Sequence, residues 1–321
     1  MVKDRQEECC PVCGEKLFSA FAAKSIYLRL VRCVACGHVY RNPAPSEEEL
    51  SEIYKSYHNF KKNKFYNENI EEWFKDPDGQ YQYAINFVNK RGGFYGKSVL
   101  DVGCGSGRFL FECRKYGALI TGVDPHPQAV NFAREHFDIE VVPKDIEQAV
   151  QEGIILASSF DFIFAFEILE HIKKPVVFLS LLNRLLLPGG LLFVSTPNFQ
   201  FERLLRTVDQ IAEEYPEHSN FFEPISLINC LARYDFQVVE AATVCNYTYG
   251  ERQKQILSRN SFINSLWKKV RRNVFLHAAK DIFFKILDIY KQPIDARGLN
   301  GSHLICIVQN SGPRPKNDLR R

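Results

Sequence analysis

Four cysteines near the start of the chain have the types and spacing of a metal site. Cys10 and Cys13 form one C-x-x-C pair, Cys33 and Cys36 form a second, and 19 residues separate the pairs. Two pairs at this spacing place four thiolates around one tetrahedral ion, which leaves no position for a substrate. The spacing therefore predicts a structural zinc in a module of residues 1–45. Redox chemistry is the weaker alternative because two pairs occur together.

Three glycines at alternate positions predict a ligand-binding turn. They are Gly103, Gly105 and Gly107 in the stretch V-L-D-V-G-C-G-S-G-R-F, where an apolar run ends at Asp101. Glycine allows a tight turn and a close approach of the backbone to a ligand. The dinucleotide pattern G-x-G-x-x-G fails because Arg108 stands at its third glycine, and no Gly-Lys-Ser/Thr follows to make a phosphate loop. An ordinary strand-to-helix turn is the alternative for the triplet alone.

Acidic residues end the next two predicted strands. Asp124 follows Gly122 and Val123, 23 residues after Asp101. A carboxylate at this place in a doubly wound sheet accepts hydrogen bonds from ribose hydroxyls. Asp145 follows the third strand, where a carboxylate can meet an adenine amino group. With the glycine turn, these positions indicate a nucleoside-binding edge of the sheet.

A group of carboxylates and a histidine follows the fourth predicted strand. Glu167, Glu170 and His171 lie in the stretch F-E-I-L-E-H, at the expected start of a helix. At spacings i, i+3 and i+4 they would share one helix face, which could bind substrate or a hard divalent cation. The alternative is that Glu170 and His171 only cap and orient that helix.

A second histidine lies in the stretch E-Y-P-E-H-S-N-F-F-E-P. A histidine beside a carboxylate is suited to remove a proton from a hydroxyl or an acidic C–H. His218 is the predicted base, Tyr215 and Glu217 are placed to orient it and stabilise its charge, and His171 is the competing candidate. The apolar helix that follows, I-S-L-I-N-C-L-A-R-Y, is expected to cap the acceptor pocket. The alternative is a simple lid loop.

The elements that must position these residues alternate between strand and helix. Such alternation favours a parallel sheet covered on both faces. We therefore predict an α/β fold: a Rossmann-like, seven-stranded, mostly parallel sheet with helices on both faces, a small N-terminal zinc ribbon and a C-terminal helical insertion. The predicted strands are 98–102, 118–123, 139–143, 160–165, 190–196, 236–244 and 303–309, and the predicted helices are 107–116, 127–137 and 174–187.

Composition and charge narrow the function classes. The 321 residues are 45% hydrophobic with a net charge of +3, so the chain can bury a core and is no polycation for nucleic acid. No signal peptide or membrane span is recognised, and the cysteine pattern suits a reducing cytosol, so a cytoplasmic location is expected. Residues 260–291 are basic and amphipathic. A helical hairpin packed on the core is the favoured interpretation, and peripheral contact with the inner membrane face is the alternative.

Taken together, the motifs resemble the class I S-adenosylmethionine-dependent methyltransferases, across about residues 80–310. The stretches F-D-F-I and L-P-G-G, around the fourth and fifth strands, add to the resemblance. It implies that the glycine turn holds the methionine and ribose part of S-adenosylmethionine, and that Asp124 and Asp145 contact ribose and adenine. The cofactor set implied for this chain is Asp101, Gly103, Gly105, Gly107, Asp124, Asp145 and Glu167.

Two further elements resemble small-molecule methyltransferases. F-E-I-L-E-H and S-T-P-N are similar to elements of the ubiquinone-biosynthesis O-methyltransferases. Tyr215, Glu217 and His218 are similar to a cluster of deoxysugar C-methyltransferases, which also carry an N-terminal zinc module. The resemblance implies an enzyme (EC 2.1.1.-) that methylates a hydroxyl or acidic carbon of a small molecule, such as a glycan, lipid-linked or secondary-metabolite acceptor.

Two other functions stay open. An rRNA or tRNA methyltransferase is disfavoured because the rRNA enzymes with a similar zinc module lack a loop like F-E-I-L-E-H. A cofactor-binding scaffold without turnover is the third interpretation. The expected domain division is a zinc-binding module at 1–45, a helical lid or linker at 46–95, a methyltransferase domain at 96–310 with a helical insertion at 250–298, and a disordered tail at 311–321.

Overall fold

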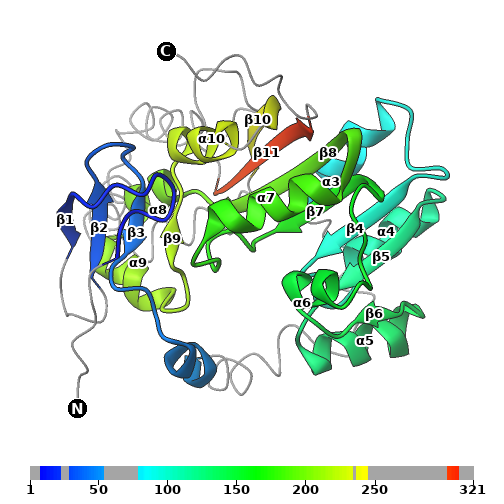
Figure 1. Ribbon diagram of the computed structural model, residues 1–321, viewed down its shortest axis with the longest axis horizontal. Coiled ribbons are helices and arrows are strands. Elements are labelled where there is room, and N and C mark those ends of the chain that lie inside the picture. The colour runs from blue at the N-terminus through cyan, green and yellow to red at the C-terminus, as the bar shows by residue number, and fades with distance from the viewer. Residues whose placement is uncertain (1–7, 23–28, 54–78, 234–235, 245–301, 311–321) are drawn as a thin grey trace, which may run out of the picture.

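The computed structural model describes residues 8–22, 29–53, 79–233, 236–244 and 302–310 (Figure 1). Three expectations therefore lie outside the described residues: the helical insertion at 250–298, the basic segment at 260–291 and the tail at 311–321. Within the described ranges, no helix is both long enough and apolar enough to cross a membrane.

A seven-stranded sheet forms the body of the molecule (Figure 1). Its strand order is β10-β11-β8-β7-β4-β5-β6, in which β11 runs antiparallel to both neighbours and the pairs from β8 to β6 are parallel. The predicted seven-stranded, mostly parallel sheet is confirmed. The strands are β4 (Ser98–Val102), β5 (Leu119–Val123), β6 (Val141–Val142), β7 (Phe160–Phe166), β8 (Leu186–Pro197), β10 (Phe236–Val244) and β11 (His303–Asn310).

Helices cover both faces of this sheet because its strands are apolar on both sides. In β7, Ile163 joins one buried cluster and Phe164 joins the other, as the two-residue period of a strand requires. The first cluster also holds residues of α6 (Ile146–Gln151), α7 (Pro175–Leu185) and α10 (Pro224–Ala232). The second holds residues of α3 (Gly79–Asn89), α4 (Arg108–Lys115) and α5 (Pro127–Phe137).

A second, four-stranded sheet contains the cysteine-bearing segment. Its order is β1 (Phe18–Ala22), β2 (Leu30–Cys33), β3 (Val39–Arg41) and β9 (Asn220–Phe221). The first three strands come from the start of the chain, whereas β9 comes from the segment before α10. Figure 1 shows β1, β2 and β3 beside β9, α8 (Phe199–Leu205) and α9 (Val208–Glu214). Sequence reasoning gave no sign of this shared sheet.

Candidate functional site

The three glycines of the predicted turn all have left-handed backbones, with φ of 69° at Gly103, 52° at Gly105 and 76° at Gly107. Other L-residues rarely adopt this conformation. A Cβ at Gly103 would lie 2.3 Å from Cδ1 of Ile168, and one at Gly107 would lie 3.0 Å from Cβ of Ala133. At Gly105 such an atom would have nothing within 4 Å. The turn is therefore closed by packing at both ends and open at its middle.

Asp124 lies directly at this open middle. It is buried, its Oδ2 accepts a hydrogen bond from the Gly105 N–H at 2.9 Å, and its Oδ1 accepts one from the His126 N–H at 2.9 Å. Burial and the charge of Asp124 raise the pKa of Asp101, which is also buried, well above its usual range. Asp124 thus places a buried carboxyl group beside the open middle of the turn, where it could accept hydrogen bonds from the hydroxyl groups of a ligand.

The other two residues of the cofactor set have structural partners. Asp145 is the N-cap of α6, and its Oδ1 accepts a hydrogen bond from the Gln148 N–H at 2.8 Å. Glu167 has a φ of 55°, its carboxylate accepts a hydrogen bond from Ser195 Oγ at 2.9 Å, and its Oε2 lies 3.4 Å from His303 Nε2. Strained backbones of this kind concentrate at functional sites.

The expected helix at residues 167–171 is wrong, because these residues form a turn. α7 begins only at Pro175, with Lys174 as its N-cap, so neither a shared helix face nor capping by Glu170 and His171 occurs. The left-handed backbone of Glu167 diverts the chain after β7 and sends it over the glycine turn. This path places Ile168 against Gly103.

Two histidines that are far apart in the sequence meet at this turn. The rings of His171 and His218 have centroids 4.7 Å apart at an interplanar angle of 86°. The ring of Tyr215 stacks on the ring of His218, with centroids 4.7 Å apart and an interplanar angle of 6°. One ligand atom each from Glu170, His171 and His218 lies within 4.8 Å of the others. We call these three residues the proton-transfer cluster, after the role proposed for them below.

Burial differs across the proton-transfer cluster. His218 is 6% exposed, whereas the side chain of His171 is 27% exposed. Glu170 is buried, and burial together with the charges of Glu167 and Glu217 raises its pKa well above the usual range. Its backbone oxygen accepts hydrogen bonds from the N–H groups of Ser219 and Asn220, at 2.8 and 3.0 Å. Those two bonds fix the segment of His218 against the turn after β7.

A small hollow, part of it open to solvent, lies beside the proton-transfer cluster. Sequence reasoning missed α8 and α9, which supply Glu202 and Ile211 to its wall, and α10 does not cap it as expected. α10 instead packs on β10 and β11. The lining residues are Glu170, Thr196, Pro197, Phe199, Glu202, Ile211, Tyr215, His218, Asn220 and Phe221.

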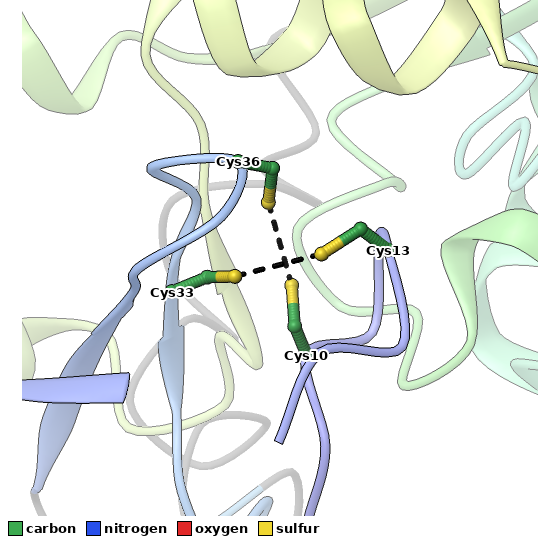
Figure 2. A group of neighbouring side chains, drawn as sticks. All are labelled: Cys10, Cys13, Cys33 and Cys36. Atoms are coloured by element: carbon green, nitrogen blue, oxygen red, sulfur yellow. Dashed lines mark hydrogen bonds between the residues drawn. The ribbon is translucent and has the colours of Figure 1, made fainter. Parts of the chain in front are cut away.

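The four cysteines converge on one point (Figure 2). The Sγ atoms of Cys10 and Cys36 lie 3.6 Å apart and those of Cys13 and Cys33 lie 3.5 Å apart, and all four are within 4.8 Å of one another. A tetrahedron with metal–sulfur bonds of about 2.3 Å has edges of about 3.8 Å. The residues present therefore fit a tetrahedral zinc ion.

The turns that carry the cysteines match each other. Gly14 and Gly37, each one residue after a pair, have φ of 75° and 72°. Their N–H groups donate to the carbonyl oxygens of Cys10 and Cys33 at 2.9 and 3.0 Å. Two equivalent turns thus present two thiols each.

A family model described as "Methyltransferase domain" matches residues 75–241, more than half of the chain. The chain belongs to this methyltransferase family. With its seven-stranded fold and glycine turn, it is a class I S-adenosylmethionine-dependent methyltransferase. The match begins after the four-cysteine cluster and ends in β10, so it includes the glycine turn and the proton-transfer cluster.

Curated relatives of this methyltransferase include ubiquinone biosynthesis O-methyltransferases. The protein of that name from Actinobacillus pleuropneumoniae serotype 7 (strain AP76) is 31% identical over 178 residues, which cover 48% of this chain and 75% of the relative. The one from Coxiella burnetii (strain Dugway 5J108-111) is 34% identical over 136 residues, which cover 41% of this chain and 56% of the relative.

Solved structures share the fold. A chain of the complex between the Haloferax volcanii Trm112 methyltransferase activator and the putative methyltransferase has a TM-score of 0.53 and 12% identity, and the match covers 84% of this chain and all of that one. The [4+2]-cyclase SpnF has a TM-score of 0.50 and 17% identity, covering 83% and 97%. These two proteins have different names, so the fold alone does not decide the reaction.

Proposed function

We propose that this methyltransferase transfers the methyl group of S-adenosylmethionine to a hydroxyl or an acidic carbon of a small molecule. The observation that carries the proposal is the proton-transfer cluster. It is built on the same turn that touches Gly103: within residues 167–171, Ile168 packs against the glycine turn and His171 contacts His218. Both kinds of acceptor must lose a proton, and histidine is the common side chain for this task at neutral pH.

The cofactor is held by the glycine turn and by the acids around it. Asp124 binds the ribose hydroxyls, and Asp101, Asp145 and Glu167 complete the set. When bound, S-adenosylmethionine supplies a methyl group that the sulfonium has already activated. The protein's part is to align the acceptor and to take its proton: the acceptor oxygen or carbon bonds to the methyl carbon, the carbon–sulfur bond breaks, and His218 receives the proton.

Gly105→Ala should abolish cofactor binding at a small cost in stability. Its Cβ would enter the open middle of the turn, where the cofactor is expected, and the positive φ should cost about 1–2 kcal/mol. Gly153→Ala is the matched control, since Gly153 also has a positive φ, of 71°, and nothing within 4 Å of a Cβ. Thermal unfolding should show similar losses of stability in the two variants. Calorimetry with S-adenosylhomocysteine should show a loss of binding in Gly105→Ala only. Equal affinity in both variants contradicts the assigned pocket.

Asp124→Ala should weaken the binding of S-adenosylhomocysteine by about ten- to a hundredfold, the usual effect of losing hydrogen bonds to a charged group. Asp161→Ala is its control, because Asp161 accepts bonds from Lys97 and Ser98 at the start of β7, the opposite edge of the sheet. Calorimetry with a 2′,3′-dideoxy analogue isolates the ribose contact. Wild type should discriminate against the analogue and Asp124→Ala should not; continued discrimination removes the ribose assignment.

The acceptor is a small molecule with polar groups. The hollow presents the carboxyl groups of Glu170 and Glu202, the second paired with Arg206 at 2.8 Å, beside the aromatic rings of Phe199 and Phe221. Carboxyl groups bind hydroxyl groups and aromatic rings cover flat or apolar faces, which supports an acceptor with a free hydroxyl, such as a glycan, lipid-linked molecule or secondary metabolite. The relatives named ubiquinone biosynthesis O-methyltransferases act, by their name, in the synthesis of a small molecule, which supports this choice.

The direct test uses S-adenosylmethionine labelled in the methyl group. Incubation with a library of small hydroxylated metabolites should label one chemical class, and the product should carry the label on oxygen or carbon. Label in RNA at moderate salt supports the nucleic-acid alternative instead. Tight cofactor binding without labelling of either pool supports a scaffold without turnover.

We further propose that Cys10, Cys13, Cys33 and Cys36 hold one structural zinc. The four sulfurs have the separations of a tetrahedral site, and their number leaves no coordination position for chemistry. The zinc acts by joining the turn before β1 to the turn between β2 and β3, and it takes no part in methyl transfer.

A further inference from the structure

The cysteine module is connected to the proton-transfer cluster by continuous hydrogen bonding. β3 pairs with β9 in antiparallel register, so Val39 faces Phe221 and Tyr40 faces Asn220. His218 stands two residues before β9. The segment that carries the predicted base is therefore an edge strand of the module's own sheet (Figure 1).

Arg41 extends this connection with its side chain. It is 3% exposed, its Nε donates to the carbonyl of His218 at 3.1 Å, and its Nη2 donates to the carbonyls of Ala212 and Tyr215 at 3.2 and 3.0 Å. Its backbone N–H also donates to the carbonyl of Ser219 at 2.9 Å. One residue thus binds four carbonyls of the segment that contains His218.

The geometry explains why the residue is an arginine. α9 ends at Glu214 with Tyr215 as its C-cap, so the carbonyls of Ala212 and Tyr215 lie at a helix C-terminus, which carries partial negative charge. A guanidinium offers several donors in one plane together with a permanent positive charge. Burial lowers the pKa of Arg41 to about 10, which leaves it charged at neutral pH, and the charge of Glu217 opposes that shift.

A second bridge holds the other wall of the cluster. His38 Nε2 lies 3.0 Å from Oδ1 of Asn220, and Nδ2 of Asn220 donates to the carbonyl of Ile172 at 2.7 Å. Ile172 directly follows His171. The module thus reaches both histidines, one through Arg41 and the other through Asn220.

We propose that Arg41 is a positioning residue of the acceptor site: by binding the carbonyls of Ala212, Tyr215 and His218, it holds the His218 ring between Tyr215 and His171. The role assigned to that ring rests on the proposed function, whereas the positioning itself does not. The N-terminal module is then part of the methyl-acceptor site, although it supplies no group that touches the reacting atoms.

The test compares Arg41→Met, Arg41→Lys and Arg114→Met in the full chain. Arg114 is the matched control: it also donates to two carbonyls at a helix end, those of Phe137 and Asp138 after α5, but not in this segment. Histidine ring signals in NMR spectra, assigned with a His218→Gln variant, report the geometry. Zinc content and S-adenosylhomocysteine affinity are measured on the same samples.

Arg41→Met should shift the His218 ring signals and abolish the nuclear Overhauser effect between the rings of His218 and Tyr215. Arg41→Lys should produce an intermediate shift, because one ammonium group cannot reach all three carbonyls. If Arg41→Met does not fold, Arg41→Lys takes its place in the comparison. Arg114→Met should leave these signals in place. Cofactor affinity should stay within about twofold in all three variants, as expected for a distant site.

Unchanged His218 signals in a folded Arg41 variant overturn the proposal, and so do equal shifts in the Arg41 and Arg114 variants. Neither readout needs an acceptor or turnover. A failure of the base role proposed for His218, seen as normal methyl transfer by His218→Ala, is therefore distinguishable from a failure of the positioning role.

Discussion

A chain with both Cys33→Ser and Cys36→Ser should contain no zinc and should lose the folded structure of residues 8–41, yet still bind S-adenosylhomocysteine. The module has short strands, and two of its buried side chains, Cys10 and Cys33, are themselves proposed ligands. Structural zinc contributes about 10–16 kcal/mol in small modules. That is comparable to the whole stability of an ordinary domain, about 5–15 kcal/mol. The glycine turn is held by β4, β5 and α4 instead, so its affinity should persist.

Metal analysis, hydrogen exchange and calorimetry measure the three parts of this expectation. Cys9→Ser is the matched control, because Cys9 is an exposed neighbour of Cys10 and should leave the zinc in place. In the double variant, exchange protection should fall in β2 and β3 and also in β9, which shares their sheet. Full zinc occupancy in the double variant contradicts the site, and unchanged protection in zinc-free protein contradicts its structural role.

The large sheet and the glycine turn were predictable because their signals are local. Alternating strands and helices specify a parallel sheet, and strict spacing of Gly103, Gly105 and Gly107 marks positions where only glycine tolerates the backbone. The spacing of the cysteines within each C-x-x-C pair is an equally local signal, since each turn carries its own two thiols. The four cysteines do meet, as the spacing of the pairs requires for one tetrahedral site.

The acceptor side was harder to predict because it is assembled by long-range contacts. β9 has two residues, too few for a periodic pattern, and Arg41 looks like an ordinary basic residue in the sequence. The helix expected at Glu167, Glu170 and His171 was inferred from their i, i+3, i+4 spacing. That spacing does not reveal the left-handed φ of Glu167, which turns the chain away. Contact between His171 and His218 then depends on tertiary structure alone.

His218→Ala should lower the rate of methyl transfer by about a hundredfold or more, the usual size for loss of a general base, while cofactor affinity is kept. Its ring contacts include Tyr215, His171 and Phe221, and none of these three belongs to the glycine turn. Glu170, whose pKa burial raises, places its Oε1 4.0 Å from Nε2 of His171. Single-turnover rates with the acceptor identified by methyl labelling measure the effect directly.

Two further variants separate the roles within the proton-transfer cluster. His171→Ala should be slowed less than His218→Ala, since the side chain of His171 is the more exposed of the two. Tyr215→Phe keeps the ring that stacks on His218 and should retain most of the rate. Such a result would show that Tyr215 orients the His218 ring and that its phenol group does not transfer the proton. A rate lost only in His171→Ala contradicts the assignment and makes the exposed histidine the base. Normal rates in both histidine variants mean that alignment alone carries the reaction, which an activated methyl group permits when the acceptor arrives already deprotonated.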